Sequence, residues 1–116
     1  MSIRVGTDIV SVSRVKKSID KFGNKFLDRF LTSSEISRAK KIESIAGLWA
    51  AKEAISKALG CGIGKELNFK DIEIYKDSKG APHFKIKNSN FNIVDSSLSI
   101  SHDKDFAIAV VIINYL

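Results

Sequence analysis

An acid and a base stand one helical turn apart near the middle of the sequence, where they could act on a substrate together. Glu53 and Lys57 lie in the run 49–59, which is rich in alanine and is followed by Gly60. Alanine favours helix and glycine commonly ends one, so we expect a helix, from about residue 44 to 59, on which the two side chains stack. Two interpretations are open: a surface ion pair worth about 0.2–0.5 kcal/mol, or two members of a catalytic site.

A second carboxylate, Asp8, lies near the end of an alternating segment at the start of the chain. It could cap the following helix or accept a surface hydrogen bond. It could also bind a metal, because magnesium prefers oxygen ligands and is often held by one or two carboxylates together with substrate phosphates. Asp8 and Glu53, on separate elements, would suit a magnesium ion shared with a pyrophosphate, and Lys57 could then neutralise phosphate charge.

Two further features could contact a ligand. The turn 60–64 contains three glycines, which would let its backbone approach a ligand closely, although it could simply end the helix. It is not a Walker loop, since the lysine and hydroxyl of that motif are absent. His102, at the end of a predicted strand, is either structural or exposed, or it bonds a phosphate. His83 has no such context and is not assigned.

Helices and strands alternate along the chain in a way that would position these residues. Residues 3–10 alternate as in a half-buried strand, and helical spacing follows over 12–22, capped by Ser11 or Ser13 and ended by Gly23. A short helix is plausible over 24–31, and Thr32 with Glu35 forms a capping-box pattern that opens another.

The second half of the chain is strand-like. Residues 69–76 and 83–87 are joined by a turn at 77–80, while 97–102 and 106–114 form two more strands; 91–95 is ambiguous. The last strand is nearly all apolar and is expected inside the sheet. The fold class is therefore α+β: one domain over 1–116, with an N-terminal strand at an edge, several helices and a mostly antiparallel sheet.

Composition limits the partners. The 116 residues carry a net charge of +6, which predicts an anionic partner: nucleic acid, a phosphate-rich small molecule or an acidic protein. We expect no membrane partner, because no apolar segment approaches the roughly 20 residues that cross a bilayer, and residues 1–5 do not resemble a secretory signal. The single cysteine, Cys61, fits a cytoplasmic location, and cysteine and histidine are too few for a zinc site.

Basic residues gather on the predicted helices of the first half of the chain. Most would be solvated, and together they could steer an acidic partner toward the site. They are Arg14, Lys16, Lys17, Lys21, Arg29, Arg38, Lys40 and Lys41.

Four segments in order resemble one family. They are Gly6-Thr-Asp-Ile-Val10, the run 26–35, Trp49-Ala-Ala-Lys-Glu-Ala-Ile-Ser-Lys-Ala58 and Ser99-Ile-Ser-His102. Together they resemble the holo-acyl-carrier-protein synthases, the short 4′-phosphopantetheinyl transferases, over nearly the whole chain. Such enzymes transfer the phosphopantetheine arm of coenzyme A to a serine of apo acyl carrier protein in fatty acid biosynthesis, use magnesium and release adenosine 3′,5′-bisphosphate.

The resemblance implies a role for each candidate residue. Asp8 and Glu53 would bind magnesium, and Lys57 would join them in catalysis by contacting the pyrophosphate. The short members of the family are homotrimers with active sites between subunits. The coenzyme A site would include Lys57, Gly60, Gly62, Lys65, Gly80, Pro82 and His102, and the carrier protein would dock on Arg14, Lys17 and Arg29.

The sequence departs from the family pattern at four positions. Trp49 stands where phenylalanine is common, Cys61 where threonine is, Phe106 where tyrosine is, and Ala81 where lysine is. None is a proposed metal ligand. The main alternative function is a small basic nucleic-acid-binding module, but the predicted strands lack the clustered aromatic residues of an RNA-binding sheet. Intact Asp8, Glu53 and Lys57 argue against an inactive interaction protein.

Overall fold

The computed structural model of the chain describes residues 1–87 and 90–116. Its elements confirm the α+β class and alternate in the predicted order. They are β1 (Ser2–Ser11), α1 (Val12–Phe22), α2 (Asn24–Phe30), α3 (Ser33–Arg38), α4 (Ile42–Leu59), the 3-10 turn η1 (Phe69–Asp71), β2 (Ile72–Lys76), β3 (Pro82–Ile86), β4 (Ile93–His102) and β5 (Phe106–Tyr115).

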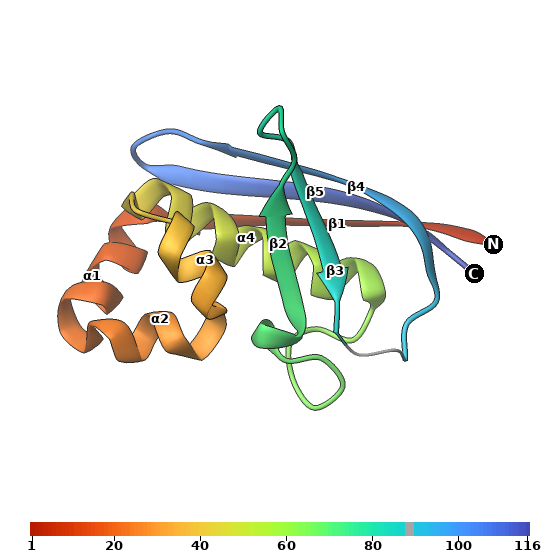
Figure 1. Cartoon of the computed structure of the whole chain (residues 1–116), viewed down its shortest axis with the longest axis horizontal. Coiled ribbons are helices and arrows are strands. Elements are labelled where there is room, and N and C mark those ends of the chain that lie inside the picture. Colours follow the sequence, from red (N-terminus) through yellow and green to blue (C-terminus); the bar gives the residue numbers. More distant parts are fainter. Residues whose placement is uncertain (88–89) are drawn as a thin grey trace.

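β1, β5 and β4 form an antiparallel sheet in that order, with β5 in the middle (Figure 1). The position of β5 confirms that the nearly all-apolar strand lies inside the sheet, and β1 is at an edge as expected. β4 begins at Ile93 rather than at residue 97, so the ambiguous segment 91–95 becomes a strand from Ile93 onward. A register irregularity between Ile93 and Asp95 marks this extension.

β2 and β3 form a separate two-stranded antiparallel sheet. The prediction of one antiparallel sheet was therefore incomplete. The predicted strand 69–76 was also too long at its start, because residues 69–71 form the turn η1. The backbone amide of Asn68 donates to Asp71 Oδ2 at 2.9 Å, and this local capping competes with strand pairing.

The long helix α4 forms the centre of the main core. Its buried residues Ala51, Ala54, Ile55 and Ala58 form a stripe of mostly small apolar side chains. They pack with residues of β5, including Val111, and with residues of β2. α4 thus contacts both sheets, and its N-terminus lies two residues before the predicted start.

Gly6 allows β1 to approach α4 closely. A Cβ atom added at Gly6 would lie 1.9 Å from the carbonyl oxygen of Ala54, a distance that no side chain could occupy. The backbones of β1 and α4 therefore touch at this point. The contact lies two residues before Asp8 on the strand and one residue after Glu53 on the helix, so it brings the two acids toward each other.

The other face of the β1–β5–β4 sheet is apolar and exposed. Ile3, Val5 and Ile9 are 74%, 66% and 63% exposed, so the alternating pattern of β1 has its apolar half away from α4. Val5 pairs with Ile112 and Ile9 with Ile108 on the neighbouring strand, which makes the surface continuous. We call this surface the outer face. It consists of Ile3, Val5, Ile9, Phe106, Ile108, Val110 and Ile112.

The helices α1, α2 and α3 lie together at one end of the molecule (Figure 1). Ser11 caps α1 by accepting a hydrogen bond from the Arg14 amide, and Gly23, at φ 60°, ends it as predicted. Thr32 and Glu35 form the predicted capping box at the start of α3. Within the described residues, no helix has the length and apolar character needed to cross a membrane.

Candidate active site

Asp8 and Glu53 line one cavity, of about 360 Å³. Asp8 comes from β1 on the side that packs against α4, and Glu53 comes from α4 itself. Sequence reasoning could name both acids but not place them together. We call this space the carboxylate cavity; its other lining residues are Ile9, Val10, Ser11, Arg14, Val15, Ser18, Phe26 and Trp49.

The two carboxylates interact electrostatically. Burial is the largest influence raising the pKa of Glu53, the negative charge of Asp8 raises it further, and the positive charge of Lys57 opposes both. Two carboxylates that line one cavity are suited to a divalent cation, and proteins usually bind magnesium through one or two carboxylates. In the described part of the chain, no three or more His, Cys, Asp or Glu side chains gather as a metal site. Asp8 and Glu53 therefore fit magnesium if substrate phosphates supply further ligands.

Lys57 forms an ion pair with Asp8 across the contact between α4 and β1. Its Nζ donates to Asp8 Oδ1 at 2.9 Å and to the backbone oxygen of Thr7 at 3.1 Å. Glu53 and Lys57 share α4 as predicted, and the positive charge of Lys57 acts on Glu53. The close approach of β1 gives Lys57 a hydrogen-bonding partner that the sequence did not indicate. The side chain of Lys57 is 53% exposed, so its ammonium also remains open to an anionic ligand.

The predicted carrier-docking residues lie close to this cavity or on exposed helices next to it. Arg14 lines the carboxylate cavity from α1. Lys17 is exposed further along α1, and Arg29 is exposed near the end of α2. Their positive charges would attract an acidic protein to this end of the molecule.

Three of the predicted coenzyme A residues meet at a second cavity, of about 210 Å³. Gly80 and Pro82 come from the β2–β3 turn and strand, and His102 comes from the end of β4. We call this space the hairpin cavity; its other lining residues are Glu35, Arg38, Ala39, Ser44, Gly47, Leu48, Ile74, Tyr75, Lys76 and Ile100. It shares no lining residue with the carboxylate cavity.

Lys57 lies in the last turn of α4, and the other three predicted coenzyme A residues follow this helix. Gly60 ends the helix in the left-handed conformation at φ 82°, so the helix-stop interpretation of this glycine holds in the structure. Gly62 also has a positive φ, and Lys65 is exposed. None of the three lines either cavity. Within one chain, the predicted coenzyme A residues therefore lie in two regions: the hairpin cavity and the end of α4 with the turn after it.

Sequence reasoning missed the cationic residues of the hairpin cavity. Arg38 was grouped with the solvated basic residues of the first helices, and Lys76 was not selected at all. Their position depends on how the β2–β3 hairpin folds over α3 and α4. One signal was available: Arg38 closes the helix that the capping box opens, and that box includes Glu35.

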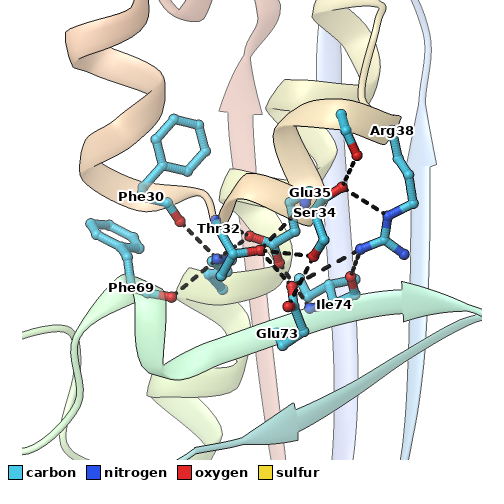
Figure 2. A network of polar contacts seen from close by, with 10 residues as sticks. Phe30, Thr32, Ser34, Glu35, Arg38, Phe69, Glu73 and Ile74 are labelled. Atoms are coloured by element: carbon cyan, nitrogen blue, oxygen red, sulfur yellow. Dashed lines mark hydrogen bonds and ion pairs between the residues drawn. The ribbon is translucent and has the colours of Figure 1, made fainter.

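A buried ion pair joins α3 to α4 (Figure 2). Lys52 Nζ donates to Glu35 Oε1 at 2.7 Å, and both side chains are fully buried. The same ammonium donates to the backbone oxygens of Phe30 and Phe69, at 2.7 and 3.0 Å. Burial lowers the pKa of Lys52, and the hydrogen bond and charge of Glu35 oppose that effect. Lys52 is the residue before Glu53, so this pair also fixes the part of α4 that carries Glu53.

Two of the departures from the family pattern have a clear structural setting. Trp49 packs against Phe26, Phe30 and Phe69, with ring centroids 4.8 to 5.9 Å apart, so an aromatic ring at this position anchors α4 among α2 and η1. Cys61 is half-buried, and burial, followed by the charge of Glu66, raises the pKa of its thiol.

Comparison with known proteins agrees with the geometry. The model of the 4′-phosphopantetheinyl transferase superfamily matches residues 4–111. A holo-[acyl-carrier-protein] synthase of Sulfurovum sp. is 52% identical over 116 residues, covering 97% of this chain and 98% of the relative. One of Nautilia profundicola is 59% identical over 110 residues, covering 94% and 97%.

Solved structures give the same result. The Helicobacter pylori holo-[acyl-carrier-protein] synthase in complex with coenzyme A matches with a TM-score of 0.91 at 52% identity, covering 95% of this chain and 99% of that one. The Bacillus anthracis synthase in complex with CoA (3′,5′-ADP) matches with a TM-score of 0.84 at 39% identity, covering 97% and 96%.

The chain therefore belongs to the 4′-phosphopantetheinyl transferase superfamily. Within that superfamily, the predicted enzyme type, a phosphopantetheinyl transferase of the holo-[acyl-carrier-protein] synthase kind, is confirmed.

Proposed function

We propose that this enzyme transfers the 4′-phosphopantetheine arm of coenzyme A to a serine of apo acyl carrier protein, for fatty acid biosynthesis. The serine oxygen forms a bond to the β-phosphorus of coenzyme A, the bond from that phosphorus to the bridging oxygen breaks, and adenosine 3′,5′-bisphosphate leaves. The serine proton passes to a basic group of the site. The observation that carries the proposal is the meeting of Asp8 and Glu53 at one cavity, with Lys57 bonded to Asp8, in a chain of this family.

The residues of the carboxylate cavity, together with Lys57 beside Asp8, would supply what this reaction requires. Asp8 and Glu53 would hold a magnesium ion, which supplies charge stabilisation to the pyrophosphate when it is bound. Lys57, with its exposed ammonium beside Asp8, would neutralise charge on the leaving phosphate. Phosphoryl transfer depends mainly on positioning and on charge neutralisation, and these groups would provide both.

Coenzyme A would use both cavities, but in different chains. Arg38, Lys76 and His102 give the hairpin cavity three basic groups for the anionic nucleotide end, and Tyr75 and Pro82 give it apolar walls. Gly60, Gly62 and Lys65 would contact the ligand beyond Lys57. We propose a homotrimer in which the hairpin cavity of one chain completes the carboxylate cavity of its neighbour.

The outer face supports this assembly. A continuous apolar surface on a β-sheet is usually covered by protein, and symmetric copies of one chain can cover it mutually. Burying Ile3, Val5 and Ile9, each more than 60% exposed in the single chain, would stabilise such an assembly. The carrier protein would dock on Arg14, Lys17 and Arg29, near the open side of the carboxylate cavity. We place the reaction in the cytoplasm, where the free thiol of Cys61 would remain reduced.

The decisive test is modification of a carrier protein. The full chain, the cognate apo acyl carrier protein, coenzyme A and Mg²⁺ are combined, and the carrier is followed by intact-mass spectrometry. We expect a gain equal to one phosphopantetheine arm, absent when EDTA replaces Mg²⁺ and absent when alanine replaces the acceptor serine of the carrier. No mass gain with the complete mixture would refute the proposal. Tight, salt-dependent binding of nucleic acid without transfer would favour the alternative module.

A further inference from the structure

Arg38 is held in a fixed orientation at the edge of the hairpin cavity. Its Nη2 donates to the backbone oxygen of Ile74 at 2.8 Å, and its Nε donates to the backbone oxygen of Ser34 at 3.1 Å (Figure 2). Its side chain is still 46% exposed. A guanidinium has five N–H donors, so Arg38 can keep both backbone contacts and also donate to an anion in the cavity.

Glu73 lies beside this guanidinium. Its Oε2 is 4.0 Å from Arg38 Nη2, and its side chain is only 16% exposed. Oε2 also accepts a 2.6 Å hydrogen bond from Thr32 Oγ1, and Oε1 accepts a 3.0 Å hydrogen bond from Ser34 Oγ. Burial disfavours the ionised form, but these two hydrogen bonds and the charges of Lys87 and Arg38 outweigh it and lower the pKa of Glu73. Glu73 is therefore a fixed negative charge.

A fixed carboxylate next to the hairpin cavity should weaken the binding of an anionic ligand there, because like charges repel. A second, favourable effect of Glu73 on the ligand would offset this repulsion. Glu73 is joined to α3 through Thr32 and Ser34 and to the cavity through Arg38. It is thus placed to prevent the Arg38 side chain from turning toward solvent. We propose that Glu73 is a positioning residue, which orients the Arg38 guanidinium for the anionic nucleotide end of coenzyme A. This inference rests on the proposed use of the hairpin cavity by coenzyme A.

The backbone that Arg38 contacts is itself fixed by the buried ion pair. The amide of Ile74 donates to Glu35 Oε2 at 2.8 Å, while its carbonyl oxygen accepts from Arg38. Glu35 is held in turn by Lys52. The amide and the carbonyl group of Ile74 in β2 are therefore both hydrogen-bonded to side chains of α3, and α3 is joined to α4 by the ion pair. Arg38 is therefore held against backbone that is itself fixed by hydrogen bonds. Its side chain is ordered before the ligand binds, so binding loses less conformational entropy.

The test is the dissociation constant of coenzyme A for the full-length Glu73→Gln variant, measured by titration calorimetry. Glutamine keeps the shape of the side chain and removes its charge. If Glu73 acted only through its charge, coenzyme A would bind more tightly to the variant. A positioning role predicts the opposite: binding about three- to tenfold weaker, the range associated with ordering one long side chain. The KM for coenzyme A should rise in parallel, with kcat unchanged, as expected for lost ground-state and transition-state binding alike.

Arg38 variants show whether the effect passes through the guanidinium. In an Arg38→Gln background, adding Glu73→Gln should change coenzyme A affinity by less than about twofold, since interacting residues are non-additive. Arg38→Lys, at a half-exposed position, keeps the charge but lacks the planar, five-donor guanidinium that bonds two backbone oxygens and still faces the ligand, so it should bind coenzyme A as weakly as Glu73→Gln does. The control is Asp20→Asn, which removes an exposed carboxylate of α1 paired with Lys16 and should leave affinity within about twofold of wild type.

The outcomes separate this inference from the proposed function. Equal or tighter binding by Glu73→Gln, additive effects with Arg38→Gln, or wild-type affinity in Arg38→Lys would each overturn the positioning role while wild-type transfer continued. Should Glu73→Gln fail to fold, Arg38→Lys alone decides. Failure of the wild-type chain to bind coenzyme A would refute the proposed function instead.

Discussion

Glu53 is subject to opposing influences within the carboxylate cavity. Burial and the Asp8 charge raise its pKa, and Lys57 counteracts them. Ionising such a group in the folded chain lowers stability, and a cation between the two carboxylates would remove most of that cost. Ionised Glu53 therefore destabilises the folded chain when no metal is bound, although the proposed metal site depends on this residue.

We expect Glu53→Gln to separate activity from stability. Turnover should fall by about 100-fold or more, the scale of losing one charge-stabilising group. Because the pKa of Glu53 is raised on folding, its ionisation destabilises the wild type as the pH rises through the folded pKa. The variant should therefore melt at a temperature equal to the wild type near pH 4 and higher near pH 8.

The measurements are steady-state transfer rates and thermal melts from pH 4 to 8 in EDTA. Asp28→Asn, which removes an exposed carboxylate on α2, is the control and should keep its activity. Near-normal turnover in Glu53→Gln would exclude Glu53 from the metal site, and a lower melting temperature at pH 8 would contradict the assigned sign of the pKa shift.

At the scale of elements, the contact between β1 and α4 builds the carboxylate cavity. We expect Gly6→Ala to destabilise the chain by about 1–3 kcal/mol, because the new methyl group would overlap the Ala54 oxygen and push the two backbones apart. Transfer should fall as well, because Asp8 would move with β1. Gly64→Ala is the matched control: its Cβ would meet nothing within 4 Å, so its melting temperature should stay near wild type. Denaturant unfolding that is the same for both variants would contradict this account.

Much of this arrangement could be predicted from sequence, for local reasons. Caps such as Ser11 and the Thr32–Glu35 box, together with the periodicity of α4, depend on residues close to one another in the chain. The sequence could not predict which face of β1 packs against α4. An apolar face that is exposed in the single chain shows the same alternation of residues as an apolar face that is buried. The same limit applies to Arg38 and Lys52, whose partners lie on distant segments. Spacing along α4 did carry a signal for Lys52, which falls three residues after Trp49 and three before the buried Ile55.

The Glu35–Lys52 pair should be the most sensitive polar contact among α2, α3, α4 and β2. Lys52→Met leaves a buried carboxylate without its partner, which typically costs about 3–5 kcal/mol. Changing both residues, as Glu35→Leu with Lys52→Met, should recover part of this loss, since no charge is left unpaired. Lys16→Met, in the exposed pair with Asp20, is the control and should change stability by about 0.5 kcal/mol or less. Urea unfolding measures all three, and equal effects of Lys52→Met and Lys16→Met would contradict the buried network.

At the scale of the whole molecule, the two cavities and the outer face have one common explanation. The basic residues that suit a nucleotide lie around the hairpin cavity, while the acids that suit magnesium line the carboxylate cavity. A chain that acted alone would also expose a continuous apolar sheet surface to water. Assembly of identical chains through the outer face, as proposed, would cover that surface and could bring unlike cavities of neighbouring chains together.

Mixing two inactive variants tests whether neighbouring chains share a site. Glu53→Gln and His102→Ala should each transfer poorly alone. If one chain supplies Glu53 and its neighbour supplies His102, a mixed assembly contains sites with both residues intact, about a quarter of the sites at equal amounts with random exchange. We therefore expect co-refolding of the two variants to restore about that share of wild-type activity. No recovery, despite mixed assemblies seen by native mass spectrometry, would show that each site lies within one chain. Adding Val110→Lys on the outer face to both variants should abolish assembly and recovery together, whereas Asn24→Lys, which adds the same charge at the exposed start of α2, should leave both intact.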